Sequence, residues 1–220
     1  MSATCQQDRM NWAAMGYNSV AMTGRRTMAE AGITRMVEIR AASLQEFTSR
    51  GYEATTMGDI AARIGIRGPS LYKHVASKQE LLVAIMSGTM EALISAQRSA
   101  VATTTDPTER LRRAVQAHVR FHVRHQLEAF VGNREIRSVT QPHRRAILAR
   151  RAEYELGFRS LITDGLETGV FRTTSPQLAS YAILDMGIGV SAWFRNDRGL
   201  SEDEVVWQQT EFALRILGAG

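Results

Sequence analysis

The segment from Thr55 to Glu80 constrains the fold more than any other part of the chain, because it carries closely spaced start and stop signals for helices. Thr56 precedes Asp59 by three residues, which is the spacing of a capping box, so a helix is predicted to begin at about Met57. Gly65 ends that helix, because glycine adopts the left-handed conformation of a helix end without a steric penalty. This helix is therefore short and is followed by a sharp turn.

A second short helix is predicted from Pro69 to about Val75, because proline fits the first turn of a helix. Leu71 and Val75 would point inward, whereas four hydrogen-bonding side chains would point outward, namely Ser70, Tyr72, Lys73 and His74. Ser77 and Glu80 have the spacing of a second capping box, which predicts a third helix. Two short helices joined by a tight turn are typical of the helix-turn-helix that reads the major groove of DNA.

The chemistry of DNA assigns different roles to the polar side chains of this segment. Phosphates attract cations and accept hydrogen bonds, whereas base edges are read from the leading end of the second helix. Contacts to the DNA backbone are therefore predicted for Thr56, Tyr72, Lys73, His74 and Lys78. Arg67 and Ser70 lie nearer to the base edges. Lys73 and Lys78 are the only lysines among 27 basic residues, which makes both of them candidates for a specific role.

This part of the chain resembles the DNA-binding domain of the TetR family of bacterial repressors, from about Ile33 to Leu82 without a gap. The matching positions are Gly51-Tyr52, Thr56, Asp59-Ile60-Ala61, Gly65-Ile66, Leu71 to Val75 and Ser77 to Leu82. The resemblance implies a three-helix DNA-binding domain followed by a helical effector-binding and dimerisation domain. One position departs from the family pattern. Where members commonly carry a Ser or Thr cap before the second helix, this chain has Arg67, which caps less well and suits a contact to a base or a phosphate.

The chain divides into three predicted parts, which are a flexible leader over 1–32, the helix-turn-helix domain over 33–77 and a helical effector-binding and dimerisation domain over 78–220. The leader lacks the hydrophobic stretch of a secretory signal. No run of 18 apolar residues occurs in the chain, so no transmembrane helix is expected. The single cysteine, Cys5, excludes a disulfide framework and fits a reducing cytoplasm.

The remaining segments show helical periodicity bounded by caps and breaks, and no segment shows the alternation of a strand. The fold class predicted is therefore all-α. The other helices are expected over 33–50, 77–102, 107–125, 128–139, 141–169, 175–195 and 201–217.

The penultimate predicted helix carries apolar residues on more than one side, so one side can pack in the core and another against a partner, and the last helix offers further apolar residues. Two such helices from each of two subunits would form a four-helix interface, which is also the usual dimerisation mode of the resembled family. The predicted interface residues are Tyr181, Leu184, Ile188, Val205, Phe212 and Ile216. A homodimer also suits the DNA-binding domain, because two recognition helices about 34–36 Å apart would read a palindromic operator.

A row of histidines offers an alternative function. His118, His122 and His125 share one helix face, at a spacing that can present imidazoles to a metal ion, as in a metal sensor or an enzyme. The segment lacks an H-E-x-x-H motif, and the neighbouring Arg120 and Arg124 would repel a cation. Histidines that pack in the core or line a pocket are the simpler interpretation. Walker, dinucleotide-fold and nucleophile-elbow motifs are also missing, so no enzyme activity, metal or cofactor is predicted.

Arginines alternate with large apolar side chains between residues 107 and 169, where twelve arginines and five glutamates lie from Glu109 to Arg159. An apolar chamber with a guanidinium-rich mouth suits a ligand that is apolar at one end and multiply anionic at the other, because guanidinium pairs with phosphate in a bidentate fork. An acyl-CoA thioester has this form, whereas a lipophilic cation would require buried carboxylates. The predicted effector-binding residues are His118, Phe121, His122, Arg145, Ile147, Arg150, Tyr154, Phe158, Met186 and Trp193.

The same region resembles the TetR subgroup that controls fatty-acid and sterol-ring breakdown in response to acyl-CoA thioesters, at Arg134 to Arg137, Arg150 to Tyr154 and the helix of Trp193. The function predicted is a homodimeric repressor that an effector releases from its operator. Three alternatives stay open, which are a repressor that answers to another hydrophobic ligand, a metal sensor or enzyme, and a nonspecific chromosome-coating protein. For each single arginine, a solvated helix face is the simpler interpretation.

Overall fold

The computed structural model describes residues 28–197 and 199–219, and this part of the chain forms nine α-helices and one short 3-10 helix without a strand. The all-α prediction is therefore confirmed. The helices are α1 (Met28–Arg50), α2 (Met57–Arg63), α3 (Gly68–Leu71), α4 (Lys78–Val101), α5 (Pro107–Arg124), α6 (Gln126–Arg134), η2 (Ile136–Ser138), α7 (His143–Glu167), α8 (Pro176–Trp193) and α9 (Glu202–Ile216). Most of the leader predicted over 1–32 lies outside the described residues, but α1 begins within it, at Met28.

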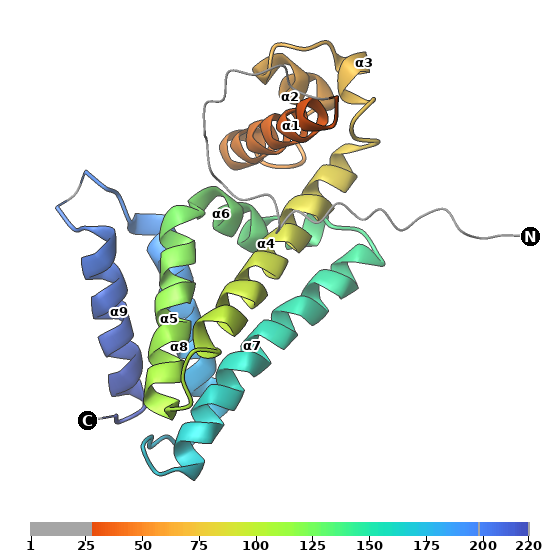
Figure 1. Cartoon of the computed structure of the whole chain (residues 1–220). Helices are drawn as coiled ribbons and strands as arrows, with labels where there is room; N and C mark the ends of the chain where they lie inside the picture. The colour runs from red at the N-terminus through yellow and green to blue at the C-terminus, as the bar shows by residue number, and fades with distance from the viewer. Residues whose placement is uncertain (1–27, 198, 220) are drawn as a thin grey trace, which may run out of the picture.

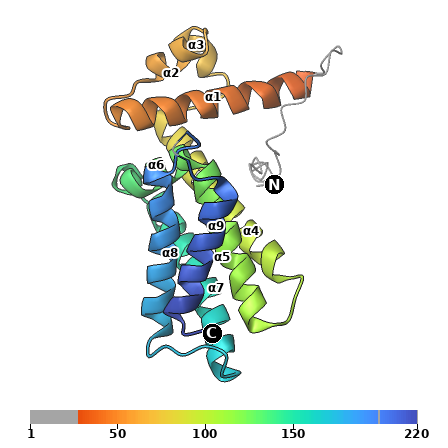
Figure 2. The same cartoon turned by 90° about the vertical axis from the view of Figure 1, so that its left-hand side faces the viewer.

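The helices form two groups that the long helix α4 connects (Figure 1). Helices α1, α2 and α3 lie together at one end of the molecule, and α4 descends from them between the remaining helices. Seen from the side, α8 and α9 lie side by side on one outer face and run in opposite directions (Figure 2). None of the described helices is both long and apolar enough to cross a membrane.

The interior consists of two hydrophobic clusters, and α4 contributes to both of them. The first half of α4 supplies Leu82 and Ile85 to the cluster that lies under α1, α2 and α3. Its second half supplies Leu93 and Ile94 to the cluster between α5, α7, α8 and α9. The first cluster also receives buried residues from beyond α4, namely Val131, Val139 and Ile147. The group formed by α1, α2 and α3 therefore shares a hydrophobic cluster with α6 and the start of α7.

Helix ends follow the local signals of the sequence. Asp106, Ser175 and Ser201 each accept a hydrogen bond from a backbone amide in the first turn of α5, α8 and α9. Gly65 adopts a φ of 68°, which only glycine takes without strain, and ends α2 as predicted. Two helices end earlier than expected. α6 was expected over 128–139 but ends at Arg134, where a 3-10 turn replaces the last part. The helix predicted from Pro69 to about Val75 ends at Leu71, so Tyr72, Lys73 and His74 lie in the turn that follows it.

Candidate DNA-contacting surface and ligand cavity

The capping box of α2 forms as the sequence predicts. The Thr56 hydroxyl oxygen accepts from the Asp59 amide at 3.1 Å, and the Asp59 carboxylate accepts from the Thr56 amide at 2.8 Å. The Thr56 hydroxyl also donates to the Asp59 carboxylate at 2.7 Å, and this bond, together with the one from the Thr56 amide, lowers the pKa of Asp59. Arg67 occupies the N-cap position of α3 and makes no side-chain capping bond, so its guanidinium is exposed and available for another contact.

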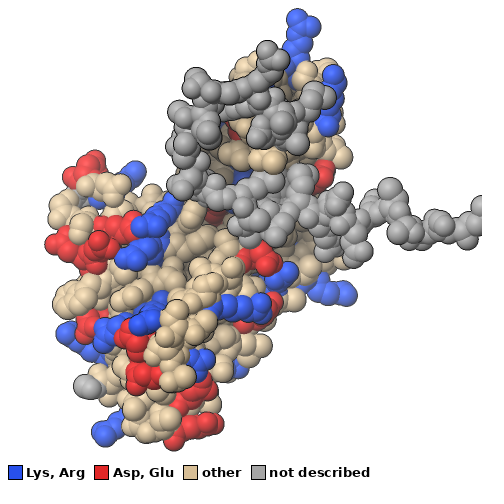
Figure 3. Space-filling model, in the orientation of Figure 1, with Lys and Arg blue, Asp and Glu red and all other residues tan. Residues whose placement is uncertain are grey.

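Helix α3 and the turn that follows it present the predicted donors outward, because apolar residues anchor this segment from below. Leu71 and Val75 are buried in the cluster beneath the helix. Tyr72 is 56% exposed, and Lys73 and His74 are exposed as well. Within the described residues, no carboxylate pairs with Lys73. In Figure 3 the outermost charged side chains at this end of the molecule are basic, and acidic side chains gather further down. The orientation of these residues suits contact with an anionic surface.

Lys78 has a different environment from the one predicted for a phosphate contact. Its ammonium group donates to the backbone carbonyls of Tyr52 and Thr55, at 2.7 Å each, and to that of Glu53 at 3.2 Å. It also lies 4.3 Å from the centre of the Tyr52 ring. Three carbonyls thus use the three protons of the ammonium group, so we reassign Lys78 from DNA contact to holding the turn before α2 against α4.

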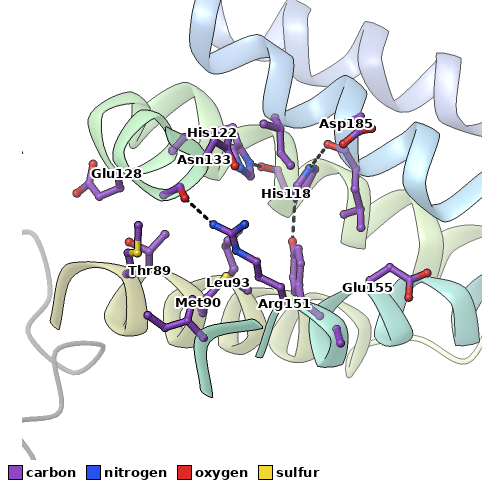
Figure 4. Close-up of a pocket in the computed structure, with 18 of the residues that line it drawn as sticks. Thr89, Met90, Leu93, His118, His122, Glu128, Asn133, Arg151, Glu155 and Asp185 are labelled. Carbon is purple, nitrogen blue, oxygen red and sulfur yellow. Dashed lines mark hydrogen bonds between the residues drawn. The ribbon is translucent and has the colours of Figure 1, made fainter. Parts of the chain in front are cut away.

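A cavity of about 480 Å³ lies in the larger group of helices, between α4, α5, α6, α7 and α8 (Figure 4). Apolar atoms form most of its surface. The cavity is lined by Met86, Thr89, Met90, Leu93, His118, His122, Glu128, Ala129, Gly132, Asn133, Ile147, Arg151, Ala152, Tyr154, Glu155, Leu156, Arg159, Tyr181, Leu184, Asp185 and Ile188. Its volume falls within the range of ordinary ligand sites, which are concave, mostly apolar and equipped with a few polar groups.

Four of the ten predicted effector-binding residues line this cavity, namely His118, His122, Ile147 and Tyr154. Six do not, and two of these are enclosed by the core: Phe158 is fully buried and Met186 packs against the same cluster. Phe121 faces another groove, between α4 and α5, and Trp193 is 43% exposed. The helical spacing places such residues on the right helices but does not tell which ones face the void.

The arginine of the first half of α7 that lines the cavity is not one of the two predicted as effector-binding. Arg150 pairs with Glu91 at 2.9 Å and Arg145 is exposed, and neither lines the cavity. Arg151 lines it instead and donates to the carbonyl of Gly132 at 2.6 Å. Burial lowers the pKa of the Arg151 guanidinium. Neighbouring residues of a helix point about 100° apart, so a shift of one position moves a side chain from a cavity to the surface.

Few of the arginines predicted to surround the mouth of the cavity are free to meet a ligand, because most of them form ion pairs on the surface. Arg112 pairs with Glu211, Arg113 with Glu109, and both Arg120 and Arg124 pair with Glu202. The cavity also has two buried carboxylates that were not expected. Glu155 is paired with Arg159, and Glu128 lies near Arg40 and His125. Among the described residues, Arg151 is the guanidinium of the wall that no carboxylate pairs with.

The histidine row does not have the geometry of a metal site. Both ring nitrogens of His118 are engaged, Nδ1 with the Tyr154 hydroxyl and Nε2 with the carbonyl of Leu184, each at 3.0 Å. Burial and the neighbouring His122 lower the pKa of His118 to about 3. Within residues 28–197 and 199–219, no cluster of three potential metal ligands is found. His118 and His122 instead form part of the cavity wall.

Helix α6 connects the cavity to the DNA-binding end of the molecule. Glu128, which lines the cavity, lies 3.6 Å from the guanidinium of Arg40 on α1. At the other end of α6, the Glu135 carboxylate accepts from the backbone amide of Tyr52 at 3.3 Å. An occupant that displaced α6 would therefore alter contacts made by two segments of the DNA-binding domain.

The predicted dimer surface is partly exposed and partly buried within the chain itself. Tyr181, Phe212 and Ile216 are exposed by 40% or more. Leu184 and Val205 are 8% and 4% exposed, because both pack in the core of their own chain, and they leave little surface for a partner. Ile188 is half-buried and lines the cavity. Three large exposed residues of this face were not predicted, namely Leu178, Trp193 and Trp207.

Known proteins resemble the chain along most of its length. Residues 39–85 match the family model described as "Bacterial regulatory proteins, tetR family", and residues 104–217 match "Tetracyclin repressor-like, C-terminal domain". The HTH-type transcriptional activator FasR of Mycolicibacterium smegmatis is 32% identical over 81% of both chains.

Two solved structures share the fold. The ketosteroid transcriptional regulator KstR2 of Mycobacterium tuberculosis superposes with a TM-score of 0.75 at 27% identity, over 84% of this chain and 93% of the other. AibR, in complex with isovaleryl coenzyme A and operator DNA, superposes with a TM-score of 0.71 at 26% identity, over 80% of this chain and 97% of the other.

Proposed function

Because the chain belongs to the TetR family of bacterial transcriptional regulators, we propose that it is a homodimeric repressor that an acyl-CoA thioester releases from a palindromic operator. In this proposal α3 enters the major groove, α8 and α9 form the dimer interface, and the cavity holds the acyl part of the effector. The protein then acts in the cytoplasm, where its DNA lies.

The observation that carries the effector half of the proposal is the guanidinium of Arg151. It lies in the wall of a mostly apolar cavity, it is partly desolvated, and within the described residues no carboxylate pairs with it. The carbonyl of Gly132 accepts one of its hydrogen bonds but does not neutralise its charge, so the favoured occupant combines an apolar body with a polar or anionic group. An acyl thioester meets both requirements, and AibR, a relative with the same fold, is named in complex with a coenzyme A thioester.

Coupling between effector and operator would pass through α6 and α4. Both helices line the cavity, and both contribute to the hydrophobic cluster under the DNA-binding domain. An acyl group that fits only a widened cavity binds preferentially the conformation in which α4 and α6 have moved apart. Effector binding then raises the fraction of dimers whose recognition helices are mis-spaced. The size of the shift is set by the ratio of the effector's affinities for the two conformations.

The test is operator binding by the full chain at fixed salt, with and without coenzyme A thioesters of graded acyl length. We expect tight binding to the intergenic DNA upstream of its own gene, resistance to random competitor DNA, and release by at least one thioester. Free coenzyme A is the control and should leave the complex intact. Binding that no thioester disturbs would instead favour a repressor that answers to another hydrophobic ligand.

The same binding assay also distinguishes a specific regulator from a nonspecific DNA-binding protein. Equal affinity for operator and random DNA would indicate a nonspecific chromosome-coating protein.

A transcription assay decides whether the protein represses or activates, because FasR is named an activator whereas KstR2 is named a repressor. We expect transcription from the bound promoter to rise when the thioester is added.

The two lysines provide a matched pair of variants for the DNA-binding half. Lys73→Ala should weaken operator and random DNA alike and lower the slope of log affinity against log salt by about 0.9 for each phosphate that is no longer neutralised. Its free energy of unfolding should not change, because the Lys73 side chain is exposed. Lys78→Ala should instead lower the free energy of unfolding by about 2 kcal/mol, since three carbonyls lose a charged donor.

Filter binding at several salt concentrations and urea unfolding would measure the two effects. A Lys73→Ala protein with an unchanged salt slope would contradict the phosphate contact. A Lys78→Ala protein with unchanged stability but a reduced salt slope would restore Lys78 as a phosphate contact.

A further inference from the structure

The hydrogen bonds of His118 determine which of its ring nitrogens carries the proton. Nε2 lies 3.0 Å from the carbonyl oxygen of Leu184, and a carbonyl only accepts, so Nε2 must be the donor. His118 is neutral because burial lowers its pKa to about 3. Nδ1 is then an acceptor, and it receives the Tyr154 hydroxyl hydrogen at 3.0 Å. Both nitrogens of His118 are satisfied, and the hydroxyl hydrogen of Tyr154 is used.

The same argument gives His122 the opposite tautomer. Its Nδ1 lies 2.9 Å from the backbone carbonyl oxygen of His118, so Nδ1 donates. Burial, together with the charge of His125, lowers the pKa of His122, which keeps the ring neutral near pH 7. Nε2 of His122 is therefore an acceptor. Within the described residues it has no hydrogen-bond donor.

The free nitrogen of His122 faces the cavity. Nδ1 is bonded to a carbonyl of its own helix, and the hydrogen-bonding sites of the two ring nitrogens point away from each other. Nε2 is consequently on the side of the ring directed away from α5. His122 is only 4% exposed and lines the cavity, as Figure 4 shows together with His118 and Arg151.

Three polar side chains of the cavity wall make hydrogen bonds to groups other than His122. The Tyr154 hydroxyl hydrogen is given to His118, and the hydroxyl of Thr89 donates to the carbonyl of Ile85 on its own helix. The Arg151 guanidinium donates to the carbonyl of Gly132. An occupant that displaces water from Nε2 of His122 must therefore provide a donor or lose a hydrogen bond.

We propose that the effector carries a hydroxyl group on its apolar body and that this hydroxyl donates to Nε2 of His122. The inference rests on the proposed function only in treating the cavity as the effector site. It narrows the effector class to hydroxylated acyl or alicyclic groups. An unsubstituted hydrocarbon leaves the nitrogen without a partner, and a ketone places a second acceptor against it.

The tautomers are tested first, without any effector, by correlation of histidine ring protons and nitrogens in the 15N-labelled full chain. We expect the protonated nitrogen to be Nε2 in His118 and Nδ1 in His122. Assignments come from the single variants His118→Gln and His122→Gln. A protonated Nε2 in His122 would overturn the inference at once, because the nitrogen facing the cavity would then be a donor.

The ligand preference is tested with cyclooctanol and cyclooctanone, two probes of nearly equal shape that can reorient freely in the cavity. We expect cyclooctanol to bind roughly tenfold more tightly, which is the effect of one buried hydrogen bond. The nitrogen resonance of His122 Nε2 should move upfield with the alcohol and stay in place with the ketone. His122→Phe should abolish the preference, and His122→Gln, which retains an acceptor, should preserve part of it.

Equal affinity for the two probes would refute the inference, as would a preference that survives in His122→Phe or an unmoved Nε2 resonance in a saturated alcohol complex. These outcomes are independent of coenzyme A. If the alcohol preference is found but no thioester releases the operator, the proposed acyl-CoA effector fails and the hydroxyl recognition stands. If a thioester releases the operator but the cavity shows no preference for the alcohol, the acyl-CoA effector stands and the hydroxyl recognition fails.

Discussion

The Gly187→Ala protein is expected to lose about 2–3 kcal/mol of unfolding free energy, because a methyl group at this position has no space. A Cβ atom there would lie 2.3 Å from Cδ2 and 2.5 Å from Nε2 of His118. The His118 ring cannot move aside, since it is 1% exposed and bonded to both Tyr154 and Leu184. Either α8 moves away from α5 or the His118 hydrogen bonds break.

Gly189→Ala is the matched control, two residues further along the same helix. A Cβ atom at Gly189 meets nothing within 4 Å, and alanine favours a helix over glycine by about 1 kcal/mol, so this protein should be as stable as the wild type or more stable. Urea unfolding at one protein concentration measures both variants. Equal stability of the two would show that α8 does not pack on His118 as closely as the structure has it.

The double variant Leu178→Glu, Phe212→Glu is expected to be a monomer. Leu178 lies on α8 and Phe212 on α9, and they are 68% and 40% exposed. The two helices run antiparallel on one outer face of the molecule (Figure 2). In a two-fold interface each substitution occurs twice, so four carboxylates would enter an apolar contact. A loss of at least about 4 kcal/mol, roughly a thousandfold in the dimer dissociation constant, is expected.

Sedimentation velocity gives the oligomeric state, and operator binding gives the consequence. A monomer would engage one half-site, so its affinity for the palindrome should fall while the free energy of unfolding of each chain changes little. Leu148→Glu is the control, because Leu148 on α7 is 47% exposed and belongs to neither α8 nor α9. A double variant that stayed dimeric would place the interface elsewhere.

The capping box of α2 and the exposed donors after α3 were predictable, because they depend on neighbours in the chain. Thr56 and Asp59 lie within one helical turn, so their spacing alone specifies the cap that the structure shows. The inward direction of Leu71 and Val75 follows from helix geometry and leaves Tyr72 and Lys73 outward. The role of Lys78 was not predictable in this way, since its carbonyl partners belong to residues 52, 53 and 55 of another segment.

The cavity could be predicted as a region but not residue by residue. Periodicity identified an α7 rich in arginine and aromatic residues, yet only packing against α6 decides that Arg151, and not Arg150, faces the void. The sequence also placed His118 and His122 on one face of a helix. It did not reveal which ring nitrogen of each histidine carries the proton, because the partner of His118 Nε2 lies 66 residues away, at Leu184.

The sequence by itself determined the family, the all-α class and the outward-facing donors of α3 and the turn after it, since these follow from local spacing. The tertiary structure decided which arginine enters the cavity, which apolar residues of α8 and α9 are left for a partner, and which nitrogen of His122 is free. The physical reason is that burial and hydrogen-bond direction depend on groups brought together from distant parts of the chain.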